Sequence, residues 1–388
     1  MSEAINRALL PAGLRDVLPG KAAFEAAVVQ EILAFFAAHG YERVKPPLLE
    51  FEDSLLTGVG ADLSAQTFRV MDPVTQRMMG MRADMTVQVA RIAESRLARE
   101  PRPLRLSYAG DVLRVKGSQL RPDRQFIQAG MELIGSDTAE ADAEAIGLGW
   151  RALLRIGVPK VSVDLTLPPL VPMVLAAAGL DGEAALAARH ALDHKDAAEV
   201  AALPPAVAGV LGRLLDVCGP FDPAFAKLKA CALPAPAEAL RGRLAAVVER
   251  LRASAPDLPL TLDAVENRGF EYHTGLCFTF FAPGWRHHLG RGGRYRTGDG
   301  GAEPATGLSL FLHSLIGILP EPVPPRRVLV PLPGVAPGVL EDLHDRGWVT
   351  VAALEPGKDW NREAIRLHCT HVLQDGHPVP ARSGHSDT

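Results

Sequence analysis

Residues 125–135 form the segment that most constrains what this chain can fold into. Apolar and polar positions alternate along it with a period of two, which is typical of a β-strand with two different faces. One face carries Ile127, Ala129, Met131 and Leu133, and the other carries Phe126, Gln128, Gly130 and Glu132. Glycine weakens a strand, and at Gly130 the missing side chain leaves room for another group to approach the backbone. The pattern predicts either an ordinary half-exposed strand or a strand that presents polar groups to a ligand.

The segments around this strand predict a mixed architecture. Further strands are expected at 104–114, joined to the first by the polar loop VKGSQLRPD, and at 161–167. Helices are expected at 19–38, 84–99 and 139–155, where the apolar residues follow a helical spacing. Strands interspersed with helices indicate a mixed scaffold.

The second half of the chain begins with a stretch rich in alanine and leucine. Its segments 183–203, 206–218 and 235–253 all have helical patterns. Strands are then expected at 258–265 and 276–281. They are followed by an expected glycine-dense turn over GRGGRYRTGDGG, at 290–301, and a buried helix at 307–319.

Four prolines at 320, 322, 324 and 325 predict a stiff linker before a small C-terminal unit. In that unit, 326–332 and 348–354 have strand patterns and 339–345 has a helical one, while the last dozen residues are expected to be frayed. The expected domains are a core made of 1–168 and 256–319, a helical insertion at 169–255, and a small α/β unit at 320–388.

The composition excludes several classes of function. Hydrophobic residues make up 47% and charged residues 22% of the 388 residues, which is typical of a folded protein with two or three domains. A formal net charge of −4 argues against a protein that coats nucleic acid or an anionic membrane. The four cysteines form no CxxC pair, the first residues lack a signal-peptide pattern, and no run of about 18 apolar residues occurs. We therefore expect a cytoplasmic protein without disulfide bonds or a membrane span.

Two groups of polar side chains flank these expected elements. Asp84 and Thr86 open the second helix, where Asp84 would also serve as an ordinary N-cap that contributes about 1 kcal/mol. Arg114, Arg121 and Arg124 surround the hairpin loop. Their guanidinium groups match phosphate or carboxylate, although a solvated basic loop explains them equally well.

The segment NRGFEYHTG at 267–275 is a third candidate. It places Arg268, Tyr272 and His273 between two apolar strands, although a hairpin turn with a half-buried tyrosine is the plainer explanation. The later glycine-rich segment lacks the spacing of a phosphate-binding loop and does not open a Rossmann helix. The sequence HCTH at 368–371 has no second pair of ligands nearby, so no metal site is expected.

In their order along the chain, these segments resemble the catalytic core of class II histidyl-tRNA synthetases. LPAGLRDVLPG and HGYERVKPPLLEFEDSLL resemble its start and its first motif, and MRADMT takes the place of LRPEGT. LSYAGDVLRVKGSQLRPDRQFIQAGMELIG resembles the second motif, NRGFEYHTG resembles the histidine-specific RGLDYYTG segment, and GGRY matches unchanged. The resemblance covers roughly residues 8–319 and implies an α+β fold with the class II antiparallel sheet.

Departures from the synthetase pattern are equally informative. Lys116 stands where the second motif has a glutamate, and GLSLFLHSL puts His313 and Ser314 where the third motif has a glutamate and the arginine that grips ATP. Since adenylation depends on placed positive charge, these changes argue against it. The segment after the prolines is also shorter than an anticodon-binding domain. With DVLRVKGSQLRPDRQF, ALDHKDAAEV and ENRGFEYHTG, the chain resembles the ATP phosphoribosyltransferase regulatory subunit family, the synthetase-like partners of the short-form catalytic subunit.

The resemblance implies a pocket for free histidine, with no catalytic residues, cofactor or metal. Asp84, Thr86 and Gln128 would receive the ammonium group, and Arg268 with Gln128 the carboxylate. Glu132 with Tyr272 or His273 would hold the imidazole. The implied histidine-binding residues are Asp84, Thr86, Arg114, Gln128, Glu132, Arg268, Tyr272 and His273.

The resemblance also implies a non-catalytic subunit that the short catalytic subunit needs for activity, and that mediates feedback inhibition by L-histidine in the first step of L-histidine biosynthesis. In the family it forms a hetero-octamer with that catalytic subunit, and the class II core implies a dimer. Binding to tRNA or to a membrane is not expected. Two alternatives stay open: an active histidine–tRNA ligase that charges tRNA(His) through histidyl-adenylate, and a stand-alone histidine-binding or RNA-binding module.

Overall fold

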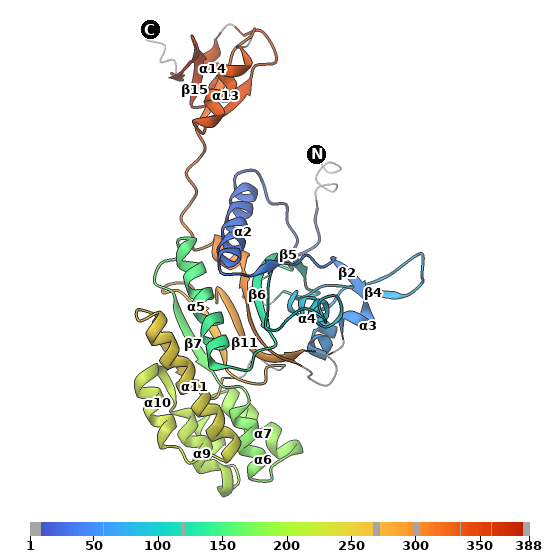
Figure 1. Cartoon of the computed structure of the whole chain (residues 1–388), viewed down its shortest axis with the longest axis vertical. Coiled ribbons are helices and arrows are strands. Elements are labelled where there is room, and N and C mark those ends of the chain that lie inside the picture. The colour runs from blue at the N-terminus through green and yellow to red at the C-terminus, as the bar shows by residue number, and fades with distance from the viewer. Residues whose placement is uncertain are drawn as a thin grey trace. The chain divides into compact units, whose positions relative to one another are not determined.

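The computed structural model describes residues 9–382 except for short gaps at 57, 118–121, 267–271, 298–302, 334 and 358, and for the side chains at 58, 59, 61 and 62. The chain separates into two compact units, Met1–Pro320 and Glu321–Thr388 (Figure 1). No helix in the described part of the chain combines the length and the apolar character needed to cross a membrane.

The first unit is built around a nine-stranded sheet in the order β1-β5-β6-β12-β11-β10-β7-β9-β8. Its strands are β1 Glu42–Arg43, β5 Leu104–Leu113, β6 Gln125–Ile134, β7 Ser162–Thr166, β8 Cys218–Pro220, β9 Leu260–Asp263, β10 Cys277–Phe281, β11 Gly290–Thr297 and β12 Glu303–Phe311. From β5 to β7 all neighbouring pairs are antiparallel, whereas β1 and β9 join in parallel. The predicted α+β fold with an antiparallel sheet is confirmed.

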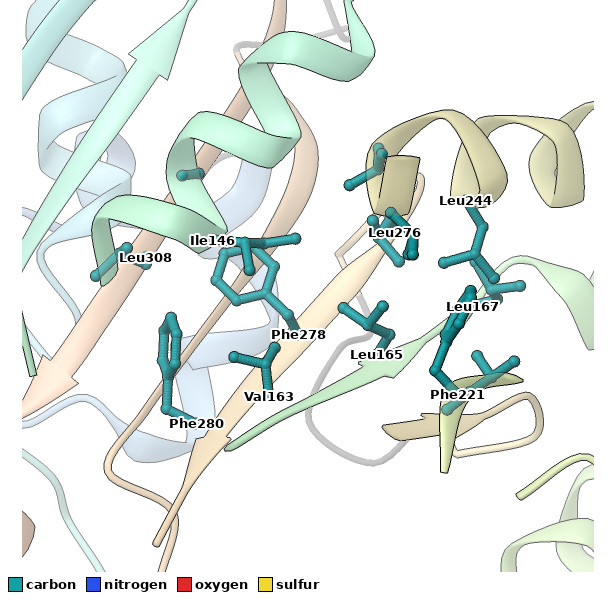
Figure 2. Packing of buried hydrophobic residues seen from close by; sticks show 14 of the residues in the cluster. Ile146, Val163, Leu165, Leu167, Phe221, Leu244, Leu276, Phe278, Phe280 and Leu308 are labelled. Carbon is teal, nitrogen blue, oxygen red and sulfur yellow. The ribbon is translucent and has the colours of Figure 1, made fainter. Parts of the chain in front are cut away.

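Helices α2 (Lys21–Ala38) and α5 (Ala139–Arg155) pack against this sheet through apolar side chains. Figure 2 shows Ile146 of α5 above Phe278 and Phe280 of β10. All three side chains are at most 1% exposed, and burying each one stabilises the fold by about 1.5–3 kcal/mol. The apolar face predicted for the strand at 125–135 belongs to the same core, with Ala129 and Met131 fully covered.

The alanine- and leucine-rich stretch forms helices, as expected for its three segments. They are α6 Leu170–Ala177, α7 Gly182–Asp193, α8 Ala197–Ala201, α9 Pro205–Leu215, α10 Phe221–Ala230 and α11 Ala235–Ser254. In Figure 1 these light-green to yellow helices gather at one end of the first unit. Helix α11 also contacts the core, since Arg243 Nε donates to Asp142 Oδ2 of α5 at 2.9 Å. A separate insertion domain at 169–255 therefore stays a prediction.

Two sequence-based predictions for the strands near the site are wrong. Residues 290–297 of the expected glycine-dense turn form strand β11, and most of the expected helix at 307–319 belongs to strand β12 and the short helix α12 (Leu312–Ile316). The glycines of β11 serve close packing rather than a turn, because a Cβ at Gly292 would lie 2.1 Å from the Gly307 carbonyl oxygen. An apolar run buried on both sides has no period that separates strand from helix.

A smaller three-stranded sheet, which the sequence did not predict, lies beside the large one in the first unit. It consists of β2 (Leu49–Phe51), β3 (Arg69–Met71) and β4 (Met78–Met81) in the order β2-β4-β3, with the short helices α3 (Glu52–Leu55) and η1 (Gly58–Gln66) nearby. Helix α4 follows at Thr86–Ser95, shorter than the predicted 84–99.

The second unit contains a four-stranded sheet in the order β14-β13-β15-β16, with helices α13 and α14. Its elements are β13 Arg327–Val330, α13 Pro337–Asp345, β14 Val349–Ala352, α14 Trp360–Arg366, β15 His371–Gln374 and β16 His377–Pro380. The predicted alternation of β and α is confirmed. Fraying of the last dozen residues is wrong for 377–380, because β16 pairs with β15.

Candidate functional site

The polar face of β6 lies in the middle of the sheet, where no solvent reaches it. Gln128 and Glu132 are each only 1% exposed, so the interpretation as a half-exposed strand is wrong. An amide and a carboxyl group at this depth require polar partners, since leaving either unpaired would cost several kcal/mol, on the order of 2–7. Those partners come from four other segments of the first unit.

Glu132 is held by two tyrosines. Tyr108 Oη of β5 donates to its Oε1 at 3.1 Å, and Tyr295 Oη of β11 donates to its Oε2 at 2.9 Å. Burial raises the pKa of Glu132 to about 8, although the hydrogen bonds from the two hydroxyl groups act to lower it. Burial and the neighbouring carboxyl group also raise the pKa values of both phenols, which therefore keep their protons and act as donors.

Two glycines make room for this arrangement. A Cβ at Gly130 would lie 2.6 Å from Tyr108 Oη, and a Cβ at Gly307 would lie 1.8 Å from Glu132 Oε2. The space that the sequence predicted at Gly130 therefore exists, and the phenol of Tyr108 fills it.

Asp84, Thr86 and Gln128 form a connected group next to Glu132. Gln128 Nε2 donates to Asp84 Oδ1 at 3.1 Å and to Ser309 Oγ at 2.6 Å. Asp84 Oδ1 also accepts the backbone N–H of Thr86 at 2.8 Å. The predicted N-cap role of Asp84 is wrong, because α4 begins at Thr86 and Met85 stands at its N-cap without a side-chain cap. Thr86 Oγ1 lies 3.2 Å from Tyr108 Oη, which links this group to the carboxyl group of Glu132.

Tyr272 and His273 cover the same region from the segment before β10. Their rings stack with centroids 4.0 Å apart, and Tyr272 meets the Tyr295 ring edge-on at 6.0 Å. His273 fits because position 293 is glycine, where a Cβ would lie 2.7 Å from its Cδ2. The pocket that remains has a volume of about 10 Å³. It is lined by Asp84, Thr86, Glu132, Tyr272, His273, Arg291, Gly292, Gly293, Tyr295, Gly307, Leu308 and Ser309.

The structure brings together most of the predicted site residues. Asp84, Thr86, Glu132, Tyr272 and His273 line the small pocket, and Gln128 bonds to its wall. Arg114 lines a neighbouring and larger cavity instead. Arg268, like Arg121 of the hairpin loop, lies outside the described residues. Among the residues that the structure describes, no group of three or more His, Cys, Asp or Glu side chains is arranged to hold a metal ion.

Sequence reasoning missed Tyr108, Ser309 and Arg291, and it left Tyr295 out of the site. The GGRY match at 292–295 contained a signal for Tyr295. Nothing local marks Tyr108 or Ser309, because each reaches the site only through the pairing of β5 and β12 with β6.

Comparison with known proteins identifies the fold. A family model described as histidyl-tRNA synthetase matches residues 13–315. A crystal structure of an ATP phosphoribosyltransferase regulatory subunit/histidyl-tRNA synthetase from Bacillus halodurans superimposes with a TM-score of 0.80 at 24% identity, covering 92% of this chain and 96% of that one. An ATP phosphoribosyl transferase complex from Thermotoga maritima has a chain with a TM-score of 0.59 at 17% identity, covering 74% of this chain and 97% of that one. The fold is thus that of the class II histidyl-tRNA synthetase-like proteins.

A curated relative is more specific. The ATP phosphoribosyltransferase regulatory subunit of Paramagnetospirillum magneticum is 58% identical over 373 residues, which cover 96% of this chain and 98% of the relative. The chain belongs to the ATP phosphoribosyltransferase regulatory subunit family. This membership favours the regulatory role over the alternative of an active histidine–tRNA ligase.

Proposed function

We propose that this chain is the histidine-sensing regulatory subunit of an ATP phosphoribosyltransferase. It binds free L-histidine in the pocket over Glu132 and adjusts the rate of a short catalytic chain, which itself carries out the reaction. Family membership supports the regulatory role. The four free cysteines suit a reducing compartment such as the cytoplasm.

The observation that carries the proposal is the buried Glu132 clamped between Tyr108 and Tyr295. With a pKa of about 8, its carboxyl group holds a proton at neutral pH that an imidazole can accept. The result is a charge-assisted hydrogen bond, worth roughly 1.5–3 kcal/mol. A side chain without a ring nitrogen would leave the carboxyl group unpaired, so the site can reject isosteres of histidine.

The other ends of histidine have matching partners. Asp84, Thr86 and Gln128 are polar and adjacent, and we assign them to the ammonium group. Arg268 with Gln128 is assigned to the carboxylate. Because a volume of about 10 Å³ holds little more than a water molecule, histidine enters only when the stacked Tyr272 and His273 move away from Glu132.

The partner is assigned by similarity. The Thermotoga maritima structure contains an ATP phosphoribosyl transferase complex in which one chain shares this fold. We infer a hetero-octamer with the catalytic subunit, built on dimers of this chain. Histidine binding and the partner's activity are then coupled, typically by about 1–3 kcal/mol.

Titration calorimetry with L-histidine tests the proposal at the pocket. We expect saturable binding by the full chain and none by Glu132→Ala, while Glu144→Ala, a carboxyl group paired with Arg105 elsewhere in the same unit, keeps the wild-type affinity. Unchanged affinity in Glu132→Ala would refute the assignment of the imidazole to Glu132.

A further inference from the structure

Lys195 has an unusual backbone conformation at the turn between helices α7 and α8 of the alanine- and leucine-rich stretch. Its φ is +52°, in the left-handed region that favours glycine at the end of a helix. The turn is anchored to the last turn of α7, since the Lys195 N–H donates to the Leu192 carbonyl oxygen at 3.0 Å. A lysine is strained there where a glycine would not be, so its side chain is what sets this turn apart.

The side chain of Lys195 reaches the large sheet of the first unit. Its ammonium group forms an ion pair with Asp263 Oδ2, at the end of β9. The other oxygen, Asp263 Oδ1, accepts the backbone N–H groups of Val265 and Glu266, each at 3.2 Å. One carboxylate therefore joins the turn between α7 and α8 to the start of the segment 264–273, which ends on the two stacked rings over the histidine pocket.

Two more carboxyl groups lie near this ion pair. Burial raises the pKa of Asp164 on β7, and the charges of Asp263 and Glu266 act in the same direction. Lys195 and the hydrogen bond from Thr261 act against them. Without the ammonium group, Asp263 and Glu266 would be repelled by Asp164, whose place in the sheet is fixed by its strand. The ion pair therefore keeps the start of the segment against the sheet.

We propose that Lys195 is a positioning residue of the histidine pocket. By holding Asp263, it keeps the stacked rings of Tyr272 and His273 closed over the pocket, which has a volume of only about 10 Å³. Histidine enters when those rings move away, so the ion pair and the ligand favour different positions of the segment. Through the same bond, a movement of α7 and α8 changes the affinity for histidine. The inference rests on the proposed function of the pocket.

The size of the effect follows from the exposure of the pair. The Lys195 side chain is 48% exposed and that of Asp263 15%, so water and salt screen the attraction. A pair of this kind shifts an equilibrium by a factor of about two to five. Its loss raises the open fraction of molecules, and with it the apparent affinity for histidine, by up to the same factor.

Calorimetry with L-histidine compares two lysine variants with similar backbones. Lys195→Gln removes the ammonium group, and we expect it to bind histidine about two- to five-fold more tightly than the wild type. Lys160→Gln is the matched control, because Lys160 is exposed and also left-handed, with φ +50°, and it should bind as the wild type does. Lys195→Arg keeps the charge and should restore wild-type affinity. A damaged fold would weaken binding, so tighter binding separates positioning from a merely structural role.

Asp263→Asn tests the path of the effect. Asparagine keeps an oxygen for the N–H groups of Val265 and Glu266 but loses the charge that pairs with Lys195. It should therefore tighten histidine binding, and the double variant should bind no more tightly than Lys195→Gln alone. If the two changes add, Lys195 acts by another path and the proposal is wrong.

Hydrogen exchange without ligand separates the inference from the proposed function. In Lys195→Gln, but not in Lys160→Gln, we expect the backbone amides of Glu266, His273 and Thr274 to exchange faster than in the wild type. If histidine binds and Lys195→Gln does not bind it more tightly, the inference fails and the histidine sensor stands. If the full chain does not bind histidine, the proposed function fails, and the exchange rates alone decide whether Lys195 holds this segment.

Discussion

Replacing Glu132 with glutamine should make the protein more stable at alkaline pH. A pKa of about 8 against an ordinary value of 4.5 means that ionising this buried group costs the folded state about 5 kcal/mol, at about 1.36 kcal/mol for each pKa unit. Because the pKa is raised by folding, the contribution of Glu132 to stability is fully present below pH 4.5 and is lost as the pH rises through 8. Glutamine keeps the size of the side chain and does not titrate.

Urea unfolding of both proteins across this range measures the effect. Between about pH 5 and about pH 9, the free energy of unfolding of the wild type should fall relative to Glu132→Gln by about 4 kcal/mol. Other titrating groups are common to both proteins and cancel in the difference. Glu144→Gln is the control: burial raises the pKa of Glu144, but the hydrogen bonds from Arg105 and Tyr41 together outweigh burial and lower it, so this group stays ionised throughout the range. A difference between wild type and Glu132→Gln that does not change with pH would refute the reasoning.

Three further changes test the site and its support. Gly307→Ala places a Cβ 1.8 Å from Glu132 Oε2. It should therefore destabilise the first unit by about 1–3 kcal/mol in chemical unfolding and weaken histidine binding in calorimetry. Wild-type values in both assays would contradict the close packing. Tyr295→Phe removes one donor from Glu132 and so raises the pKa of that carboxyl group further. We expect histidine affinity to fall about ten-fold and the loss of stability to continue to a higher pH than in the wild type. Arg294→Ala leaves Asp142 with Arg243 as its remaining charge partner. We expect the free energy of unfolding to fall by about 3–5 kcal/mol in the same assay. A decrease below about 1 kcal/mol would show that Arg243 alone compensates the buried charge of Asp142.

The sequence predicted those parts of the fold whose information is local. Helix 139–155 was predicted with the bounds that the structure shows, because its apolar residues follow a helical spacing, and Thr138 caps its first turn. The strands at 104–114 and 125–135 were found by their alternation and their polar loop. The polar face of one strand and the start of one helix made Asp84, Thr86, Gln128 and Glu132 candidates, but only the resemblance to histidyl-tRNA synthetases implied a common pocket for them.

The remaining parts depend on tertiary pairing. Gly292 and Gly293 suggested a turn, yet they are strand residues that let a neighbouring carbonyl group and the ring of His273 approach. Tyr108 and Ser309 become site residues only when β5 and β12 take their places on either side of β6. Neither the burial of Glu132 nor its raised pKa is visible in a strand that alternates like any half-exposed one.

Reconstitution with a short ATP phosphoribosyltransferase catalytic chain is the most direct test of the central claim. The rate of formation of the phosphoribosyl-ATP product is measured for the catalytic chain alone, after addition of this chain, and after addition of L-histidine. The account predicts that this chain raises the rate, that histidine lowers it again, and that Glu132→Ala keeps the activation while losing the inhibition. If mixing produces no complex and no change in rate, or if histidine inhibits the Glu132→Ala complex as well as the wild type, the account is contradicted.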